Sequence, residues 1–167
     1  MLKNNNMIYE DNYIRNILES TKTIAMIGLS SSWQRPSYFV AKYLLDRGYK
    51  IFPINPKEAG KTILKQKVYS NLSEIKEKID MVDIFRKTSD VGYIINDVLK
   101  IKPSTIWLQI GIINLYAEKL AKSNKINIIM DRCPKIEYSR LSGELGWAGI
   151  NSGIFYNKRR IIRPIIN

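Results

Sequence analysis

The sequence predicts an α/β protein built on a five-stranded parallel sheet, with the strand order 3-2-1-4-5 when the strands are numbered along the chain. Two observations predict this class. Short, continuous apolar runs recur along the chain, as is typical of strands buried on both faces. Amphipathic segments of helical period separate these runs. Strands that alternate with helices indicate right-handed crossovers and a sheet covered by helices, which is a three-layer sandwich.

The first elements form a βαβ unit behind a short helix. Residues 9–20 have the apolar spacing of an amphipathic helix. The run "TIAMIGL" (23–29) is the first strand. The segment "RPSYFVAKYLLDRGY" follows as a helix, since Pro36 suits a first helical turn and Gly48 suits a helix end. The second strand is "KIFPIN" (50–55), although its proline is more typical of edge strands.

The rest of the chain repeats this alternation. Between the second and third strands, a short extended segment leads to a helical turn opened by Ser73. Ser89 and Asn114 are the expected N-caps of the next two helices. The further strands are expected at 81–85, 105–111 and 126–131, and the further helices at 89–101, 114–124 and 135–142. We therefore divide the chain into an N-terminal helical extension (1–22), a sheet domain (23–142) and a C-terminal tail (143–167) that packs on the domain or on a partner subunit.

Composition excludes several classes of function. The 167 residues, 45% of them hydrophobic, suit one globular domain. There is no apolar run of about 20 residues, as a membrane span needs, and no secretory signal. The single cysteine excludes an intrachain disulfide and predicts a cytoplasmic location. With no histidine, the common catalytic triads, phosphohistidine chemistry and most zinc sites are removed, so we assign no catalytic and no metal-binding residue.

The net charge of +12 indicates an anionic partner. Most lysines are scattered along the chain rather than clustered. An AT-rich genome, which favours Lys, Asn and Ile codons, also accounts for such a composition. The basic segment "NKRRIIR" near the C-terminus is not interleaved with aromatic residues as in single-strand binders. Nucleic acid is therefore a disfavoured partner.

In an open parallel sheet, a ligand binds outside the carboxyl ends of the strands, where the strand order reverses. The first strand end carries Gly28, Ser30 and Ser31, with Arg35 close behind. These residues can bind a phosphate together with the free N–H groups of the following helix, which begins near Pro36. The turn has one glycine where a dinucleotide site has three.

The second strand end distinguishes between nucleotides. Asn55, Pro56 and Lys57 follow this strand, and none supplies the carboxylate that NAD recognition needs. Lys57 instead suits a phosphate on the ribose, and Arg86 adds a cation after the third strand. NADP and coenzyme A (CoA) both carry such a phosphate, and the missing glycines argue against NADP.

The sequence resembles the CoA-binding domain family, a Rossmann-like module related to the N-terminal domain of the succinyl-CoA synthetase α subunit, in its small stand-alone bacterial form. The resemblance covers residues 23–153 and is carried by "TIAMIGLS", "RPSYFVAKYLLDRGYKIFPINP", "VDIFRK", "IWLQIGI", "MDRCPKIEYSRL" and "GINSG". It implies that the diphosphate of CoA lies at the first loop and that the adenosine lies along the ends of the second, third and fourth strands. The site residues that it implies are Gly28, Ser30, Arg35, Pro36, Ser37, Asn55, Pro56, Arg86, Gln109 and Gly111.

We therefore expect a protein that binds CoA or an acyl-CoA without catalysis of its own. The chain has neither the length nor the phosphorylated histidine of a full CoA ligase. Alternatives are an NADP-type oxidoreductase, the CoA-holding subunit of a split ligase with an ATP-grasp partner, and a basic nucleic-acid-binding protein. The chain could also pair with a second copy of itself as a homodimer instead of with an ATP-grasp partner.

Two further residues, Cys133 and Asp83, are candidates for a chemical role. Cys133, beside Arg132, could form a mixed disulfide with CoA, but a half-buried structural thiol is the favoured interpretation. Asp83, inside the third strand, is interpreted as a buried hydrogen-bonding carboxylate rather than a catalytic acid.

Overall fold

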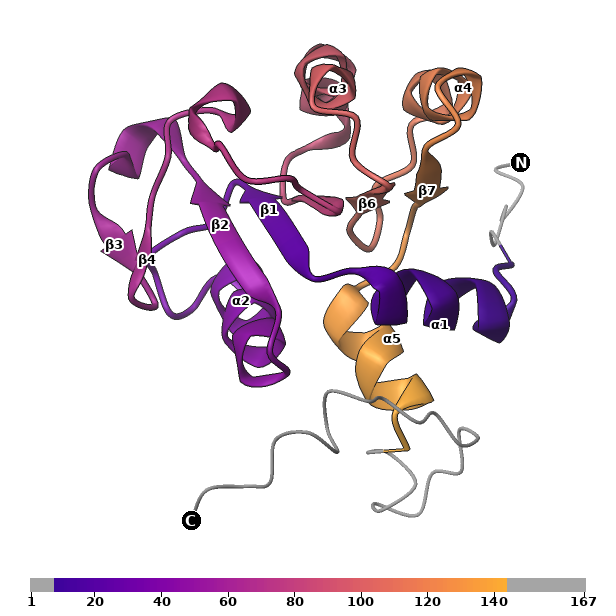
Figure 1. Ribbon diagram of the computed structural model, residues 1–167, viewed down its shortest axis with the longest axis horizontal. Helices are drawn as coiled ribbons and strands as arrows, with labels where there is room; N and C mark the ends of the chain where they lie inside the picture. Colours follow the sequence, from indigo (N-terminus) through magenta and orange to yellow (C-terminus); the bar gives the residue numbers. More distant parts are fainter. Residues whose placement is uncertain (1–7, 144–167) are drawn as a thin grey trace.

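The computed structural model describes residues 8–143, which form a parallel sheet between two layers of helices (Figure 1). The predicted fold class is confirmed. The five parallel strands are β1 (Thr23–Ile27), β2 (Lys50–Ile54), β5 (Met81–Ile84), β6 (Thr105–Leu108) and β7 (Asn127–Ile129). The α-helices are α1 (Asp11–Ser20), α2 (Pro36–Asp46), α3 (Thr88–Lys100), α4 (Leu115–Ser123) and α5 (Pro134–Leu141). A small hairpin, β3 (Thr62–Ile63) and β4 (Gln66–Lys67), and two 3₁₀ turns, η1 (Pro56–Glu58) and η2 (Leu72–Glu74), connect β2 to β5.

The predicted strand order 3-2-1-4-5 is wrong. The observed order is β2-β1-β5-β6-β7, so the third parallel strand along the chain pairs with the first and not with the second. Every residue of β5 is buried, which suits an interior strand. Pro53 has no N–H to donate and lies in the edge strand β2. Beyond β2, Tyr69 donates its N–H to the Pro53 carbonyl at 2.9 Å and covers part of this edge.

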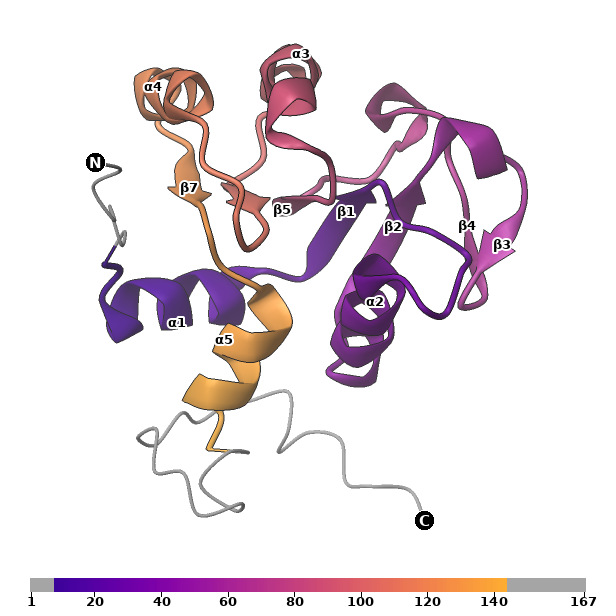
Figure 2. The same cartoon turned by 180° about the vertical axis from the view of Figure 1, so that it is seen from behind.

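The helices divide between the two faces of the sheet (Figures 1 and 2). On one face, α1, α2 and α5 enclose a core that includes Met26, Trp107 and Tyr138. On the other face, α3 and α4 cover a core that includes Val82 and Ile106. The loops at the carboxyl ends of the strands therefore lie between these two layers, where a ligand site of this fold class is expected.

Helix starts follow the sequence in part. Asn114 caps α4 as predicted, because its side chain accepts the N–H of Ala117 at 2.9 Å. Ser89 is not a cap. The helix α3 begins at Thr88, one residue before it, so Ser89 lies within the first turn. Ser73 does not open its turn either, since Asn71 accepts the Ser73 N–H at 3.0 Å and caps η2.

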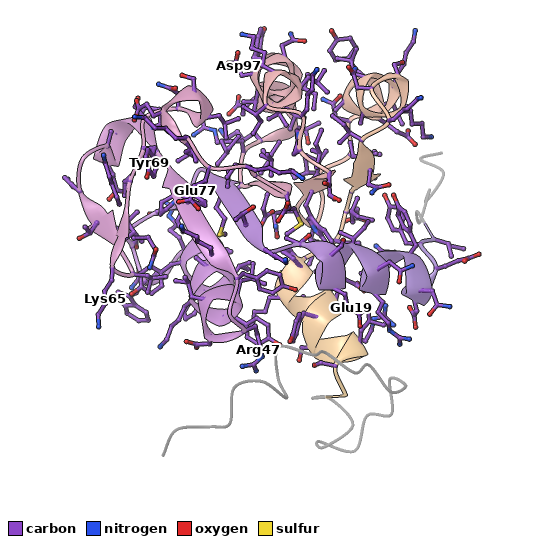
Figure 3. The ribbon with its side chains drawn as sticks, viewed as in Figure 1. Glu19, Arg47, Lys65, Tyr69, Glu77 and Asp97 are labelled. Atoms are coloured by element: carbon purple, nitrogen blue, oxygen red, sulfur yellow. The ribbon has the colours of Figure 1, made fainter. Side chains whose placement is uncertain are left out.

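The hairpin turn holds two non-glycine residues at positive φ, Leu64 at 50° and Lys65 at 63°. A two-residue hairpin loop with both φ values positive favours glycine at its second position. Leu64 packs on the core, whereas Lys65 is exposed and projects from the tip of the hairpin (Figure 3).

Replacing Lys65 by glycine is expected to stabilise the protein by about 0.5–1 kcal/mol, because glycine adopts this backbone without strain. Urea unfolding monitored by tryptophan fluorescence measures the change. The matched control is Lys67→Gly in β4, which removes the same charge but is expected to destabilise, since a strand residue becomes glycine. Equal effects of the two substitutions would contradict the role of turn strain.

The C-terminal tail and its basic segment lie outside the described residues, as does "GINSG". The division of the chain at residues 22 and 142 stays a prediction. Within residues 8–143, no helix combines the length and the apolar character needed to cross a membrane.

Candidate ligand-binding site

A cleft of about 1040 Å³ opens at the carboxyl ends of β1, β2 and β5, beside α3. It brings together residues from four separate connections of the chain. Its lining is Ile27, Gly28, Ser30, Arg35, Ile54, Asn55, Pro56, Lys57, Glu58, Ser70, Asn71, Leu72, Ser73, Arg86, Asp90, Tyr93, Ile94, Asp97, Lys100 and Ile101. The cleft lies where β2 and β5 flank β1, which is the point at which the strand order reverses.

The turn after β1 is shaped by Gly28. Its φ is +87°, and its N–H donates to the Ile54 carbonyl at 2.8 Å. A Cβ at this position would lie 2.5 Å from the carbonyl oxygen of Phe85. The turn thus needs glycine for two reasons, and it passes directly over the end of β5.

The first loop continues from this turn into α2. The Ser30 N–H donates to the hydroxyl of Ser37, and the Ser32 N–H donates to the hydroxyl of Ser30, both at 3.2 Å. These bonds fold the loop back on the start of α2, where Arg35 is the N-cap. The Arg35 side chain lines the cleft, near the positive end of the α2 dipole. This end of the cleft can therefore bind an anion.

The second strand end is held by Asn55. Its side chain accepts the Lys57 N–H at 3.1 Å, which caps η1, and donates to the Leu29 carbonyl at 2.9 Å. The loops after β1 and β2 are thereby tied together. Lys57 is exposed, and within residues 8–143 its ammonium group forms no ion pair, so it can bind a ligand phosphate.

Glu58 is a cleft carboxylate that the sequence analysis missed. Its Oε1 accepts the N–H of Ser31 and the amide of Asn55, both at 3.2 Å. The Ser31 hydroxyl and backbone N–H hold the pKa of Glu58 below its ordinary value. The second strand end therefore does present a carboxylate, one residue beyond the stretch from Asn55 to Lys57 that was considered in the sequence. The sequence did not show that Glu58 lies in a 3₁₀ turn capped by Asn55, which brings its side chain to the first loop.

The third strand end places Arg86 on the cleft wall beside α3. The guanidinium donates to Asp90 at 3.1 Å from Nε, and Nη2 lies 2.9 Å from the same carboxylate. Around the whole cleft, four cations oppose three carboxylates: Arg35, Lys57, Arg86 and Lys100 against Glu58, Asp90 and Asp97. The balance favours an anionic ligand slightly.

Part of the cleft lining is apolar. Sequence analysis missed this lining, because Ile27 and Ile54 end their strands and the other apolar residues come from η2, from α3 and from the residue after α3. Tyr93 is 84% exposed although it lines the cleft, so an aromatic ring is free to cover a planar ligand group. The apolar side chains of this part of the cleft are Ile27, Ile54, Leu72, Tyr93, Ile94 and Ile101.

Seven of the predicted site residues line the cleft: Gly28, Ser30, Arg35, Asn55, Pro56, Lys57 and Arg86. Five others do not line it: Ser31, Pro36, Ser37, Gln109 and Gly111. Ser31, Pro36 and Ser37 still belong to the first loop and the start of α2. Gly111 donates its N–H to Asp131 at 2.7 Å, in the loop after β6.

Gln109 has a buried partner. Its amide donates to Oδ1 of Asp83 at 2.5 Å, and Asp83 pairs in register with Met26 and Trp107, which belong to the core under α1, α2 and α5. Asp83 is fully buried, and burial raises its pKa to about 8. Its Oδ2 has no hydrogen-bond partner among the described residues. The burial and the hydrogen bond expected for Asp83 are confirmed, but its raised pKa makes it a protonated carboxyl rather than a carboxylate at neutral pH.

Cys133 precedes α5 and is 8% exposed. Burial raises the pKa of its thiol. A buried thiol with a raised pKa reacts slowly, which agrees with the structural interpretation. Within residues 8–143 there is no group of three or more side chains that could hold a metal ion.

Fold and cleft together define an α/β protein of the doubly wound class with a cleft at the carboxyl ends of its strands. The chain belongs to the CoA binding domain family, which matches residues 22–139. The family resemblance drawn from the sequence is confirmed.

Three similar proteins match this chain over most of their own length. The uncharacterized protein YneT of Bacillus subtilis is 35% identical over 126 residues, which cover 75% of this chain and 92% of YneT. The solved structure of the Thermus thermophilus protein ID.343 has a TM-score of 0.76 at 33% identity and covers 79% of this chain and 98% of its own. The solved structure of a hypothetical protein from Pyrococcus horikoshii OT3 has a TM-score of 0.74 at 34% identity. The match covers 79% of this chain and 92% of the Pyrococcus chain.

Proposed function

We propose that this protein binds CoA or an acyl-CoA in the cleft at the carboxyl edge of the sheet. The observation that carries the proposal is the presence of two separate anion positions in one cleft of a CoA binding domain. The first is the loop after β1 with Arg35. The second is formed by Lys57 and Arg86, from the ends of β2 and β5.

The two positions match the charge distribution of CoA, which carries a diphosphate and a ribose phosphate. The diphosphate would take the N–H and hydroxyl donors of the first loop. The ribose phosphate would take Lys57 and Arg86. The apolar lining that includes Leu72, Tyr93 and Ile101 would lie against the adenine.

Binding without catalysis is the form of this proposal that we favour. The carboxylates of Glu58 and Asp90 accept hydrogen bonds from neighbouring groups of the cleft. The chain has no histidine to transfer a phosphoryl group or a proton. We place the protein in the cytoplasm, where its single thiol stays reduced. A split ligase would add an ATP-grasp partner, and co-purification of such a partner would favour that alternative.

Titration calorimetry with CoA, dephospho-CoA and NADPH tests the proposal. We expect saturable CoA binding that weakens about tenfold when the ribose phosphate is removed, because a charge-assisted contact is lost. Lys57→Ala is expected to weaken CoA binding by a similar factor and to leave dephospho-CoA binding unchanged.

The matched control is Lys65→Ala, which removes the same charge at the tip of the hairpin, in a residue that does not line the cleft. Equal affinity for CoA and dephospho-CoA would contradict the ribose-phosphate role of Lys57. Tight NADPH binding without CoA binding would favour the oxidoreductase alternative.

A further inference from the structure

Glu58 already accepts hydrogen bonds from one donor of the first loop and from one donor at the end of β2. Its Oε1 lies 3.2 Å from the Ser31 nitrogen and 3.2 Å from the Asn55 amide nitrogen. These two donors follow two neighbouring strands, β1 and β2. Asn55 and Glu58 line the cleft at its anion-binding end, and Ser31 is the neighbour of the lining residue Ser30 in the first loop. A carboxylate oxygen and a phosphate oxygen accept hydrogen bonds of the same kind from such donors.

The carboxylate is held in this position by the local chain. Asn55 caps η1, and Glu58 is the last residue of that turn. The Glu58 N–H donates to the Asn55 carbonyl at 3.0 Å, and the Lys61 N–H donates to the Glu58 carbonyl at 3.1 Å. The backbone is thus fixed at both sides of the residue, while the side chain is half-buried and reaches the first loop.

The group is ionised at neutral pH. Contacts with the Ser31 hydroxyl and N–H hold the pKa of Glu58 below its ordinary value. A phosphate that approaches Ser31 therefore meets a negative charge and donors that are already in use. Both effects oppose binding of a small anion at this loop.

We propose that Glu58 competes with phosphate at the first loop and lowers the affinity of any ligand whose phosphate binds there. A ligand that binds only at this loop, such as inorganic pyrophosphate, does not displace the carboxylate effectively. A ligand that also binds Lys57 and Arg86 displaces it, since the second anion position contributes the additional binding free energy. This inference rests on the proposed function for the identity of the larger ligand, and on the contacts of Glu58 for the competition itself.

A different role of Glu58 predicts the opposite result. A carboxylate at the end of the second strand can accept hydrogen bonds from ribose hydroxyls, as in NAD sites. Removing such an acceptor weakens nucleotide binding, whereas removing a competitor strengthens it. The sign of the change in affinity therefore separates the two roles.

The experiment measures binding of pyrophosphate and of CoA to the full chain by calorimetry at pH 7. Glu58→Ala is expected to bind pyrophosphate roughly 2- to 5-fold more tightly than the wild type, within the range for a partly exposed charge contact. Glu58→Gln keeps the size and the acceptor oxygen but loses the charge, so its affinity should be intermediate. Affinity for CoA should rise in the same order.

The matched control is Glu74→Gln. Glu74 bonds to Ser70 and Asn71 in the neighbouring turn and makes no contact with the first loop among the described residues. It removes the same charge near the cleft, and unchanged pyrophosphate binding in this variant shows that contact with the loop is required. An equal gain in Glu74→Gln would overturn the proposal in favour of a general charge effect.

The other outcomes are also decisive. Weaker binding of CoA to Glu58→Ala would overturn the competition and assign Glu58 to ligand binding. Unchanged affinities in a protein that binds CoA would overturn the inference and leave the proposed function standing. Tighter pyrophosphate binding in a protein that does not bind CoA would support the inference while the proposed function fails.

Discussion

The free energy of unfolding is expected to fall as the pH rises from 5 to 8, because Asp83 keeps its proton in the folded protein. Burial raises the pKa of this carboxyl to about 8, whereas an aspartate in the unfolded chain titrates near pH 4. Between these values the folded state binds one more proton than the unfolded state. Raising the pH therefore favours unfolding, by at most about 1.4 kcal/mol per pH unit. Above pH 8 the folded carboxyl also ionises, and this dependence ends.

The composition makes this dependence unusually easy to assign. The chain has no histidine, the residue that normally titrates in this range. Burial raises the pKa of the Asp83 carboxyl into this range. Hydrogen bonds from neighbouring groups lower the pKa of four other carboxyls, Asp11, Glu58, Glu74 and Asp80. In Asp80, burial has the largest single effect and raises the pKa, but the hydrogen bonds together outweigh it. Those carboxyls change stability at more acidic pH.

Asp83→Asn is the variant that tests the assignment. The asparagine oxygen can still accept the Gln109 amide, and the side chain no longer ionises in either state. We expect the variant to lose the slope and to exceed the wild type in stability at pH 8 by on the order of 2–4 kcal/mol. Urea unfolding at pH 5, 6, 7 and 8 measures both. Asp97→Asn, an exposed carboxyl on α3, is the control and should keep the wild-type slope. A slope that persists in Asp83→Asn would show that another group is responsible.

The fold class could be predicted from the sequence because each parallel strand is a continuous apolar run, and each run maps to one strand. The strand order could not be derived from the same runs, since pairing partners are set by contacts between distant segments. One residue carried the relevant signal. Pro53 is compatible with an edge strand, and placing β2 at the edge leaves the position beside β1 to β5.

The candidate site also has a part that could be predicted from the sequence and a part that could not. Residues directly after a strand, such as Gly28, Asn55 and Arg86, could be predicted because the carboxyl ends of parallel strands share one edge. The apolar lining could not, because Leu72 lies in an irregular connection and Tyr93 lies on an exposed face of α3. Gln109 follows a strand as well, but its amide bonds to Asp83 and it does not line the cleft.

Gly28→Ala is expected to destabilise the protein and to disrupt ligand binding together. An alanine Cβ would lie 2.5 Å from the Phe85 carbonyl oxygen, and this atom belongs to the main chain after β5. Relief of the overlap requires β1 and β5 to move apart, since no flexible side chain can yield. The positive φ of 87° adds about 1–2 kcal/mol of backbone strain. We expect a total loss on the order of 2–4 kcal/mol, measured by urea unfolding.

The same substitution acts on the ligand site through Arg86. The new Cβ would lie 3.2 Å from the Arg86 Cδ, so the guanidinium would shift from its place beside Asp90. CoA affinity measured by calorimetry is expected to fall by about tenfold or more, because the first loop and Arg86 both move.

Gly60→Ala is the matched control for the steric argument. Gly60 has a φ of +83°, close to that of Gly28, but a Cβ there would meet no atom within 4 Å. It should therefore show the backbone strain alone, about 1–2 kcal/mol, with CoA affinity nearly unchanged. If the two variants lose equal stability, the contact with Phe85 is not what requires glycine at position 28. If Gly28→Ala loses more stability and also loses CoA, the close approach of β1 to β5 is what sets the geometry of the anion-binding loop.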